Sequence, residues 1–289
     1  MLIAQVSDPH VMLPDDPMAG FVDTASRLRA VVAALQDLPR RADVVLFTGD
    51  LVNQGRPDEY ALVREVMAPL RSRTLVIPGN HDDRAALRSA FADHTELPTA
   101  GHLSYVVDDL PLRLVGLDTT VPGRDDGELD AERLAWLSDA LADGGGRPTV
   151  LFMHHPPAPT GMWWMDYGGL KGREHLRELL AGHPEVIRVL AGHVHRSTTT
   201  MWGSTLISTA PSYFYATSAP VADLDDPWII AAPAPIPVFR WDAGGEVLVG
   251  SELDPPGDHR RMPFASVFGD RWDDYRDRAR RGDEMPAAH

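Results

Sequence analysis

Five short polar segments, each following an apolar run, constrain the fold of this chain more than any other feature. They are Asp8-Pro9-His10, Gly49-Asp50, Gly79-Asn80-His81-Asp82, His154-His155-Pro156-Pro157 and Gly192-His193-Val194-His195. Segments of helical period separate the apolar runs, so strand and helix patterns alternate. This alternation predicts an α/β fold with largely parallel, buried strands whose ends carry the functional residues.

Periodicity and cap residues bound the expected elements. We expect strands at 2–6, 44–47, 75–77, 103–107, 112–117, 150–153 and 186–190. We expect helices at 23–38, 57–70, 83–91, 130–141 and 174–180. Asp23 is a plausible cap for the first helix, and Pro57 suits the first position of the second.

The sequence pattern changes after residue 200. Nine prolines fall between Pro211 and Pro263, and no helical period appears there. We therefore predict a core at 1–200 and a proline-rich strand and loop segment at 201–268, which completes the domain as a cap or an oligomer contact. A charged C-terminal tail follows at 269–289, and it could begin as a surface helix.

Composition limits the partners and the compartment. The 289 residues carry a formal net charge of −15, which repels polyanions and argues against a long nucleic acid. There is no cysteine, so disulfides and thiolate ligands are excluded. We expect no signal peptide, and no apolar run approaches the roughly 20 residues of a membrane span. These features predict a cytoplasmic protein that does not contact a membrane.

The five segments supply oxygen and imidazole groups suited to two divalent metal ions. Asp8 and His10 are two residues apart on a segment expected to be extended, which would point both side chains the same way. His193 and His195 repeat that spacing, and Asp50 could bridge two metals with its carboxylate oxygens. The predicted ligands are Asp8, His10, Asp50, Asn80, His154, His193 and His195. Such mixed ligation suits Mn, Fe, Zn or Co without ranking them.

Two clamped divalent metals favour the cleavage of phosphate esters. Two metals contribute four positive charges, while Asp8, Asp50 and a bound hydroxide contribute three negative ones. The single remaining positive charge matches a phosphodiester better than a doubly charged phosphomonoester.

The five segments resemble the pattern D-x-H, G-D, G-N-H-[DE], H and G-H-x-H of the calcineurin-like metallophosphoesterase superfamily. The spacing from Asp8 to Asp50 to Asn80 is similar to that of bacterial glycerophosphodiesterases. The segment 117–123 is closer to class III cyclic nucleotide phosphodiesterases. Pro9 departs from the small residue common in the superfamily, and we expect no loss of metal binding from it.

The resemblance implies a four-layer α/β/β/α sandwich, which a C-terminal strand and loop appendage would follow. It implies hydrolysis of small phosphodiesters, either cyclic nucleotides or glycerophosphodiesters, by attack of a hydroxide on phosphorus. It also divides the ligands between the metals. The first metal would take Asp8, His10, Asp50 and His195, and the second would take Asp50, Asn80, His154 and His193.

The resemblance also assigns residues around the metals. His81 would contact the phosphate and donate a proton to the leaving oxygen, acting beside the bridging Asp50. The alternative for His81 is a supporting hydrogen bond with no chemical role. Arg56 would orient Asn80 and Asn53 would lie near the substrate, unless Arg56 is only a solvated charge at a helix start.

Further residues allow more than one interpretation. Trp163 and Trp164 could stack a nucleobase, cover the core or contact a partner chain. His155 is expected beside the ligands with a supporting role, and Asp118 could lie near the site or cap a strand end.

Other functions and an assembly also follow from the sequence. The same metals could serve a phosphomonoesterase or a phosphotriesterase. A non-catalytic scaffold is disfavoured because every ligand and His81 are present. The proline-rich segment and the resemblance together predict a homo-oligomer, at least a dimer.

Overall fold

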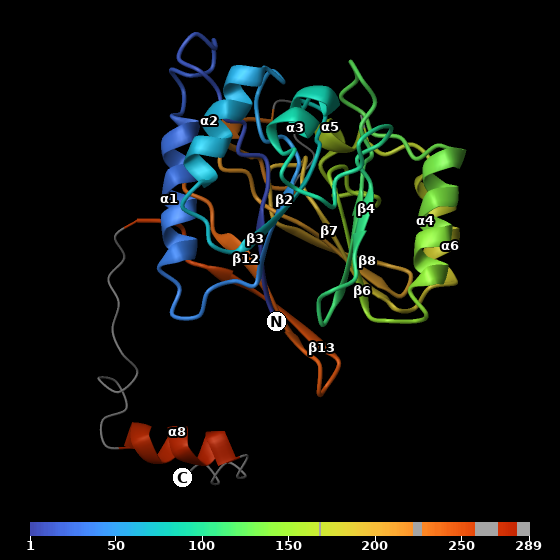
Figure 1. Cartoon of the computed structure of the whole chain (residues 1–289). Coiled ribbons are helices and arrows are strands. Elements are labelled where there is room, and N and C mark those ends of the chain that lie inside the picture. Colours follow the sequence, from blue (N-terminus) through green and yellow to red (C-terminus); the bar gives the residue numbers. More distant parts are fainter. Residues whose placement is uncertain (168, 222–226, 258–270, 282–289) are drawn as a thin grey trace. The chain divides into compact units, whose positions relative to one another are not determined.

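The computed structural model describes residues 1–167, 169–221, 227–257 and 271–281, in two units, Met1–Pro256 and Gly257–His289. In the first unit, two β-sheets face each other and helices cover the outer side of each sheet (Figure 1). The layers therefore run α/β/β/α, and the predicted fold class is confirmed.

The first sheet has five strands in the order β13-β12-β1-β2-β3. They are β1 (Leu2–Val6), β2 (Val44–Thr48), β3 (Arg73–Ile77), β12 (Ile236–Asp242) and β13 (Val247–Leu253). The first three strands run parallel, with Ile3 opposite Val44 and Leu46 opposite Leu75. β12 pairs antiparallel with β1, and β13 pairs antiparallel with β12.

The second sheet has six strands in the order β4-β5-β6-β7-β9-β8. They are β4 (Tyr105–Val107), β5 (Arg113–Leu117), β6 (Thr149–Met153), β7 (Val186–Ala191), β8 (Thr198–Trp202) and β9 (Thr205–Thr209). Strands β5, β6, β7 and β9 run parallel, while β4 and β8 pair antiparallel at the two edges.

The parallel centre of each sheet agrees with the prediction of largely parallel strands, and antiparallel pairs form the outer parts of both sheets. Short turns join β4 to β5, β8 to β9 and β12 to β13. A parallel crossover needs a dozen or more residues, so these turns allow only antiparallel pairing. Strands from beyond residue 200 thus lie within both sheets.

The helices form where periodicity and caps predicted them. Helices α1 (Thr24–Gln36), α2 (Pro57–Met67) and α3 (Arg84–Ala90) share a core with the first sheet. Helices α4 (Ala131–Asp143) and α6 (Arg173–Ala181) share a second core with the other sheet. Asp23 caps α1 by accepting a hydrogen bond from the Ser26 amide at 2.9 Å, as expected.

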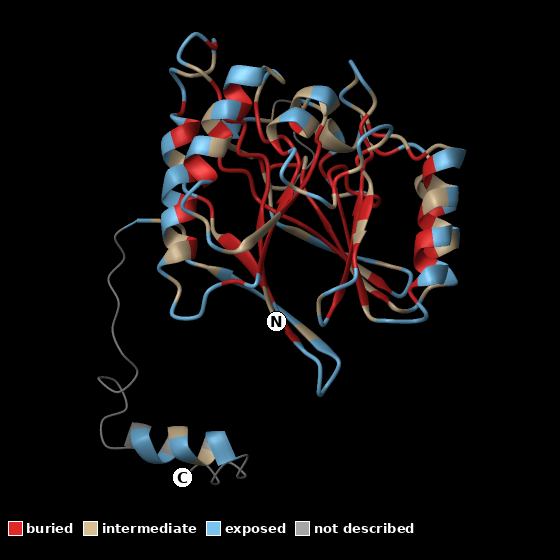
Figure 2. Cartoon of the chain, in the orientation of Figure 1, coloured by how far each residue is buried: buried red, intermediate tan, exposed pale blue. Residues whose placement is uncertain are grey.

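The central strands are buried on both faces (Figure 2). In β6, Val150 and Phe152 belong to the core shared with the first sheet, whereas Leu151 and Met153 belong to the core under α4 and α6. Because both faces are buried, the sequence of the strand is a continuous apolar run. The strand ends where this run ends, at Met153 before the polar His154.

Smaller elements complete the description. Strands β10 (Ala216–Thr217) and β11 (Ile229–Ile230) pair antiparallel, and a short helix α5 (Trp163–Asp166) replaces the expected loop at the tryptophan pair. The second unit contains α8 (Arg271–Arg281), where a surface helix was expected. Residues 222–226 and 258–268 of the proline-rich segment, and 269–270 and 282–289 of the tail, lie outside the described residues.

No described helix combines the length and the apolar character that crossing a lipid bilayer requires.

A buried ion pair joins the two halves of the sandwich. Arg84 opens α3 on the first sheet, and Asp118 follows β5 of the second. The Arg84 Nε lies 2.6 Å from an Asp118 carboxylate oxygen, and the Asp118 side chain is fully buried. Asp118 also accepts hydrogen bonds from the backbone amides of Leu103 and Thr120. The geometry fits a structural role for Asp118.

Removing this carboxylate should therefore destabilise the fold. Asp118→Ala leaves a half-buried guanidinium and two amides without their partner, which should cost about 3–5 kcal/mol of unfolding free energy. Asp109→Ala is the matched control, because its ion pair with Arg73 is on the surface and should be worth less than about 1 kcal/mol. Urea unfolding of both variants measures the difference, and equal losses would contradict the structural role.

Candidate metal centre

The predicted ligands all follow the carboxyl ends of parallel strands. In the first sheet Asp8 and His10 follow β1, Asp50 follows β2 and Asn80 follows β3; in the second sheet His154 follows β6, and His193 and His195 follow β7. Both sheets therefore contribute side chains to one place, where the carboxyl ends of their parallel strands meet.

One group of four buried side chains consists of Asp8, His10, Asp50 and His195, whose ligand atoms all lie within 4.8 Å of one another. The Nε2 atoms of His10 and His195 are 3.1 Å apart. His10 Nε2 lies 3.4 Å from Asp50 Oδ2, and His195 Nε2 lies 3.4 Å from Asp8 Oδ1. This is the set that the resemblance gave to the first metal.

Asp50 also belongs to a second group. Its Oδ2 lies 3.4 Å from His154 Nε2, and that nitrogen lies 3.0 Å from Asn80 Oδ1. The same Asn80 oxygen lies 3.1 Å from His193 Nδ1. One oxygen of Asp50 thus faces both groups, which is the position that a bridging carboxylate requires.

The surrounding hydrogen bonds fix two ring tautomers. His154 Nδ1 lies 2.8 Å from the Thr48 carbonyl, which can only accept, so Nδ1 carries a proton and Nε2 is the ring nitrogen that faces the site. His10 Nδ1 lies 3.2 Å from Asn53 Oδ1, and the Asn53 amide nitrogen donates to Asp16 at 2.8 Å. Asp16 therefore orients Asn53, which in turn orients His10 toward the other ligands.

The charges in this group are balanced poorly by the protein alone. Burial acts to lower the pKa of His154, but the charge of Asp50, the hydrogen bond to Asp50 and the charge of Asp8 together outweigh it and raise that pKa to about 9. Burial lowers the pKa of His10 to about 3 and holds that of His193 well below its usual value. Two buried carboxylates thus face one protonated ring, and unpaired buried charge is costly.

These features fit divalent cations. Lone pairs from imidazole, carboxylate and amide groups converge, with more negative than positive charge. The buried Nδ1 atom of His195 also has no hydrogen-bond partner among the described residues. The donor set is the borderline mixture that suits Mn, Fe, Zn or Co.

The backbone at the ligands differs from the extended conformation that we expected. Five ligand positions have positive φ: Asp8 (50°), His10 (42°), Asp50 (51°), His193 (71°) and His195 (56°). The only other such residue, glycine apart, in the described chain is Glu246. The extended-segment explanation for the two D-x-H and H-x-H pairs was therefore wrong. Left-handed turns, held between strand ends, bring these side chains together instead.

The glycines of the motifs allow the ligand turns to approach closely. A Cβ atom at Gly79 would collide with the Asp50 carboxylate, and one at Gly192 would collide with Ser7 and Asp8. Gly49 has a φ of 92°, and a Cβ atom there would also collide with the His154 ring. Only glycine satisfies both conditions there.

His81 lies at the open side of the site. It is exposed, its Nδ1 donates to the Asn53 carbonyl at 2.7 Å, and its ring packs edge-on against His10 with centroids 4.6 Å apart. Its Nε2 is left as the ring nitrogen available to a substrate.

The His155 ring has no nitrogen available to a substrate. Its two nitrogens form hydrogen bonds with the Thr119 hydroxyl and the Asp125 carbonyl. That arrangement fits the neighbouring role expected for His155.

The remaining predicted residues have other contacts. Arg56 forms ion pairs with Asp15 at 3.0 Å and Asp58 at 2.8 Å, at the start of α2. Trp163 and Trp164 pack edge to face with centroids 5.9 Å apart, and half of Trp163 is exposed. Their roles toward substrate, and that of Arg56 toward Asn80, stay predictions.

Two carboxylates around the site had no sequence signal strong enough to assign them. Asp82 accepts hydrogen bonds from the amides of Leu51 and Gly79 and from the Tyr60 hydroxyl, so it ties together the turns that carry Asp50 and Asn80. Asp16 lies in an irregular loop and reaches the site only through Asn53. The motif G-N-H-D included Asp82 without showing what it binds.

Comparison with known proteins agrees with this geometry. The family model described as calcineurin-like phosphoesterase matches residues 1–197. A probable glycerophosphodiester phosphodiesterase GpdQ from Arcobacter nitrofigilis is 37% identical over 213 residues, covering 73% of this chain and 78% of that protein. The 3',5'-cyclic adenosine monophosphate phosphodiesterase CpdA of Escherichia coli is 31% identical over 210 residues, covering 73% and 75%.

A solved structure shows the same fold. A dimetal phosphatase from Danio rerio superposes with a TM-score of 0.60 at 17% identity, covering 83% of this chain and 92% of that one. The two buried Asp and His groups are consistent with the dimetal site typical of such proteins. The family model and the relatives together show that the chain belongs to the calcineurin-like phosphoesterase family.

Proposed function

We propose that this phosphoesterase hydrolyses small phosphodiesters with two divalent metal ions, and that glycerophosphodiesters and cyclic nucleotides are its candidate substrates. The position of Asp50 Oδ2, which lies 3.4 Å from His10 of one predicted ligand group and 3.4 Å from His154 of the other, carries the proposal. The names of the relatives, a glycerophosphodiester phosphodiesterase and a cyclic nucleotide phosphodiesterase, support the diester class.

In this proposal Asp8, His10, Asp50 and His195 hold one metal, and Asp50, Asn80, His154 and His193 hold the other. Bound there, the metals would supply Lewis acidity that polarises the phosphoryl group and lowers the pKa of water. Asp16 and Asn53 hold the His10 ring through its Nδ1, and the Thr48 carbonyl holds the His154 ring in the same way, so the Nε2 atom of each ring would be free to bind a metal.

His81 has the position of a proton donor to the leaving alkoxide. Its exposed ring lies against His10, and the Asn53 carbonyl holds Nδ1 so that Nε2 faces outward. A proton on Nε2 could pass to the alkoxide oxygen as the ester bond to phosphorus breaks.

Metal binding should be measurable directly. Purified chain loaded with manganese or zinc should contain two ions per chain by elemental analysis, and chelation should lower its melting temperature. Ions present at 100 times their dissociation constant stabilise a fold by about 2.7 kcal/mol per site. His154→Ala should lose metal, whereas His175→Ala, on the exposed face of α6, should keep both ions. A single ion in the unchanged protein would contradict the centre.

His81→Ala should separate chemistry from metal binding. We expect kcat to fall by about 10²–10⁴ while the metal content stays at that of the unchanged protein, because His81 is not among the ligands. His175→Ala again serves as the control and should keep full activity. Loss of both metals in His81→Ala would show that the histidine supports the site and takes no part in the reaction.

A substrate panel tests the reaction class. The metal-loaded protein should be compared on 3',5'-cyclic AMP, 2',3'-cyclic AMP, glycerophosphodiesters, and an aryl diester, monoester and triester. We expect kcat/KM for the aryl diester to exceed that for the monoester at least tenfold. A large preference for the monoester or the triester would replace the diester proposal with the corresponding alternative.

Trp163→Ala can then separate the two diester classes. If the half-exposed Trp163 stacks a nucleobase, this variant should raise KM for cyclic nucleotides and leave glycerophosphodiesters unaffected. Equal effects on both classes would assign the tryptophan to packing.

The expected homo-oligomer and the cytoplasmic location stay predictions. Exposed apolar side chains on or next to the late strands, including Trp228, Ile229 and Val249, support a contact between copies.

A further inference from the structure

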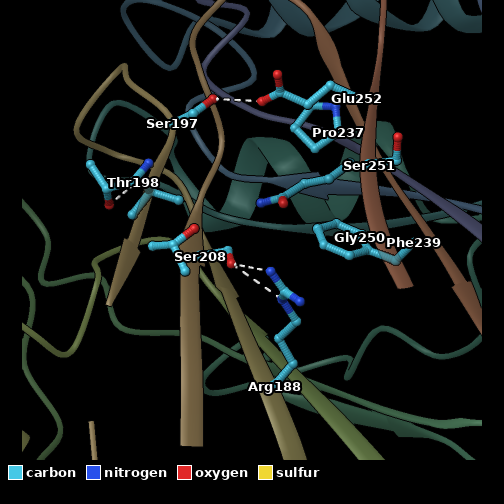
Figure 3. A pocket seen from close by; sticks show the side chains of 12 residues that line it. Arg188, Ser197, Thr198, Ser208, Pro237, Phe239, Gly250, Ser251 and Glu252 are labelled. Atoms are coloured by element: carbon cyan, nitrogen blue, oxygen red, sulfur yellow. Dashed lines mark hydrogen bonds between the residues drawn. The ribbon is translucent and has the colours of Figure 1, made fainter. Parts of the chain in front are cut away.

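A cavity of about 220 Å³ opens between the two sheets, and none of the predicted metal ligands is among its lining residues. One wall comes from β7, β8 and β9 and presents hydroxyl groups, among them Ser197, Thr198 and Ser208. The opposite wall comes from β12 and β13 and presents Phe239, Gly250 and Glu252 (Figure 3).

Arg188 lies at one end of this cavity (Figure 3). It is the one polar residue of strand β7, and its guanidinium stacks over Phe239 of the other sheet at 5.0 Å from the ring centroid. Its Nε and Nη2 atoms donate to the Ser208 hydroxyl at 3.2 and 2.6 Å. The guanidinium therefore bridges the space between the sheets.

The charge of Arg188 is not balanced by an ion pair. Among the described residues, no carboxylate lies within 4.0 Å of it, unlike Arg84 with Asp118 or Arg124 with Asp126. Burial lowers the pKa of Arg188. A guanidinium has five N–H donors, and in the described part of the chain a neutral hydroxyl is their hydrogen-bond acceptor. A desolvated cation with spare donors favours an anionic ligand.

The other end of the cavity has the opposite character. Glu252 lies there with Ser197, whose hydroxyl donates to the Glu252 carboxylate at 3.1 Å (Figure 3). A ligand that spans the cavity would thus meet donors at Arg188 and an acceptor at Glu252. The volume lies below the roughly 300–1,000 Å³ of sites for drug-sized ligands, so it suits a small metabolite.

Gly250 keeps the cavity open beside Arg188. It pairs in register with Phe239, and a Cβ atom at this position would lie 3.3 Å from Phe239 Cε1 and 3.4 Å from Arg188 Nη1. Any larger side chain would therefore fill the space in front of the guanidinium.

We propose that this cavity is a second binding site, distinct from the metal centre, for a small organic anion that also carries hydroxyl or ammonium groups. The acidic group, a phosphate monoester or a carboxylate, pairs with Arg188. The hydroxyl or ammonium groups donate to Glu252. The site needs no hydrolysis, so it stands or fails independently of the proposed reaction.

Calorimetric titration of the metal-loaded protein with glycerol 3-phosphate tests the site. We expect one binding event in addition to any at the metal centre. Arg188→Met keeps the apolar stem and should weaken that event at least about tenfold, while metal content and hydrolysis stay unchanged. Arg240→Met removes the same charge from an exposed position on β12 and should leave it intact. A titration with glycerate in place of glycerol 3-phosphate shows whether a carboxylate also suffices.

Two further variants test whether a loss of binding comes from misfolding or from non-specific attraction of anions. Gly250→Val keeps Arg188 but fills the cavity, and it should also abolish the additional event. Glu252→Ala should weaken glycerol 3-phosphate and leave inorganic phosphate unaffected, because only the former carries alcohol hydroxyl groups that can reach Glu252 while its phosphate pairs with Arg188. The proposal is overturned if the additional event is absent, if a folded Arg188→Met retains it, or if Arg240→Met loses it equally.

Discussion

Two carboxylates, Asp8 and Asp50, are buried close together where the two sheets meet. The turns around them must accommodate this buried negative charge. Among the described residues, no arginine or lysine forms an ion pair with either carboxylate, and the facing His154 has a raised pKa. The fold tolerates this charge because the surrounding turns are fixed by hydrogen bonds and by glycines. Bound divalent cations would neutralise this negative charge. The apolar core around the site fixes the side chains in positions that suit such cations.

The positions of the central strands and of the predicted ligands after them could be predicted from the sequence, because each apolar run is followed by Gly, Asp, Asn or His. Strands buried on both faces, such as β6, read as unbroken apolar runs, and Asp23 and Pro57 marked helix starts correctly. The parallel centre of each sheet followed from the alternation. The adjacent strands expected at 103–107 and 112–117 form the antiparallel pair β4 and β5. The sequence did not indicate where the strands after residue 200 pair, because β12 pairs with β1 from the other end of the chain.

Within the site, the sequence identified which side chains gather but not how the backbone presents them. A two-residue spacing was read as extended chain, whereas left-handed turns occur at Asp8, His10 and the other ligands. Asp16, Asp82 and Arg188 act through partners distant in the sequence, so local patterns could not reveal them. Their contacts depend on register and on the distance between the sheets, which are properties of the folded chain.

The left-handed turns also limit how such a centre can be moved or rebuilt. Non-glycine residues in this conformation cost about 1–3 kcal/mol each, and five of them here are predicted metal ligands. Copying the five motifs onto another scaffold would transfer the donor atoms without the two sheets that hold the turns in place. A search by sequence motif alone would therefore accept chains whose backbone cannot form these turns. A design that grafts the centre would have to include the strand ends together with the predicted ligands.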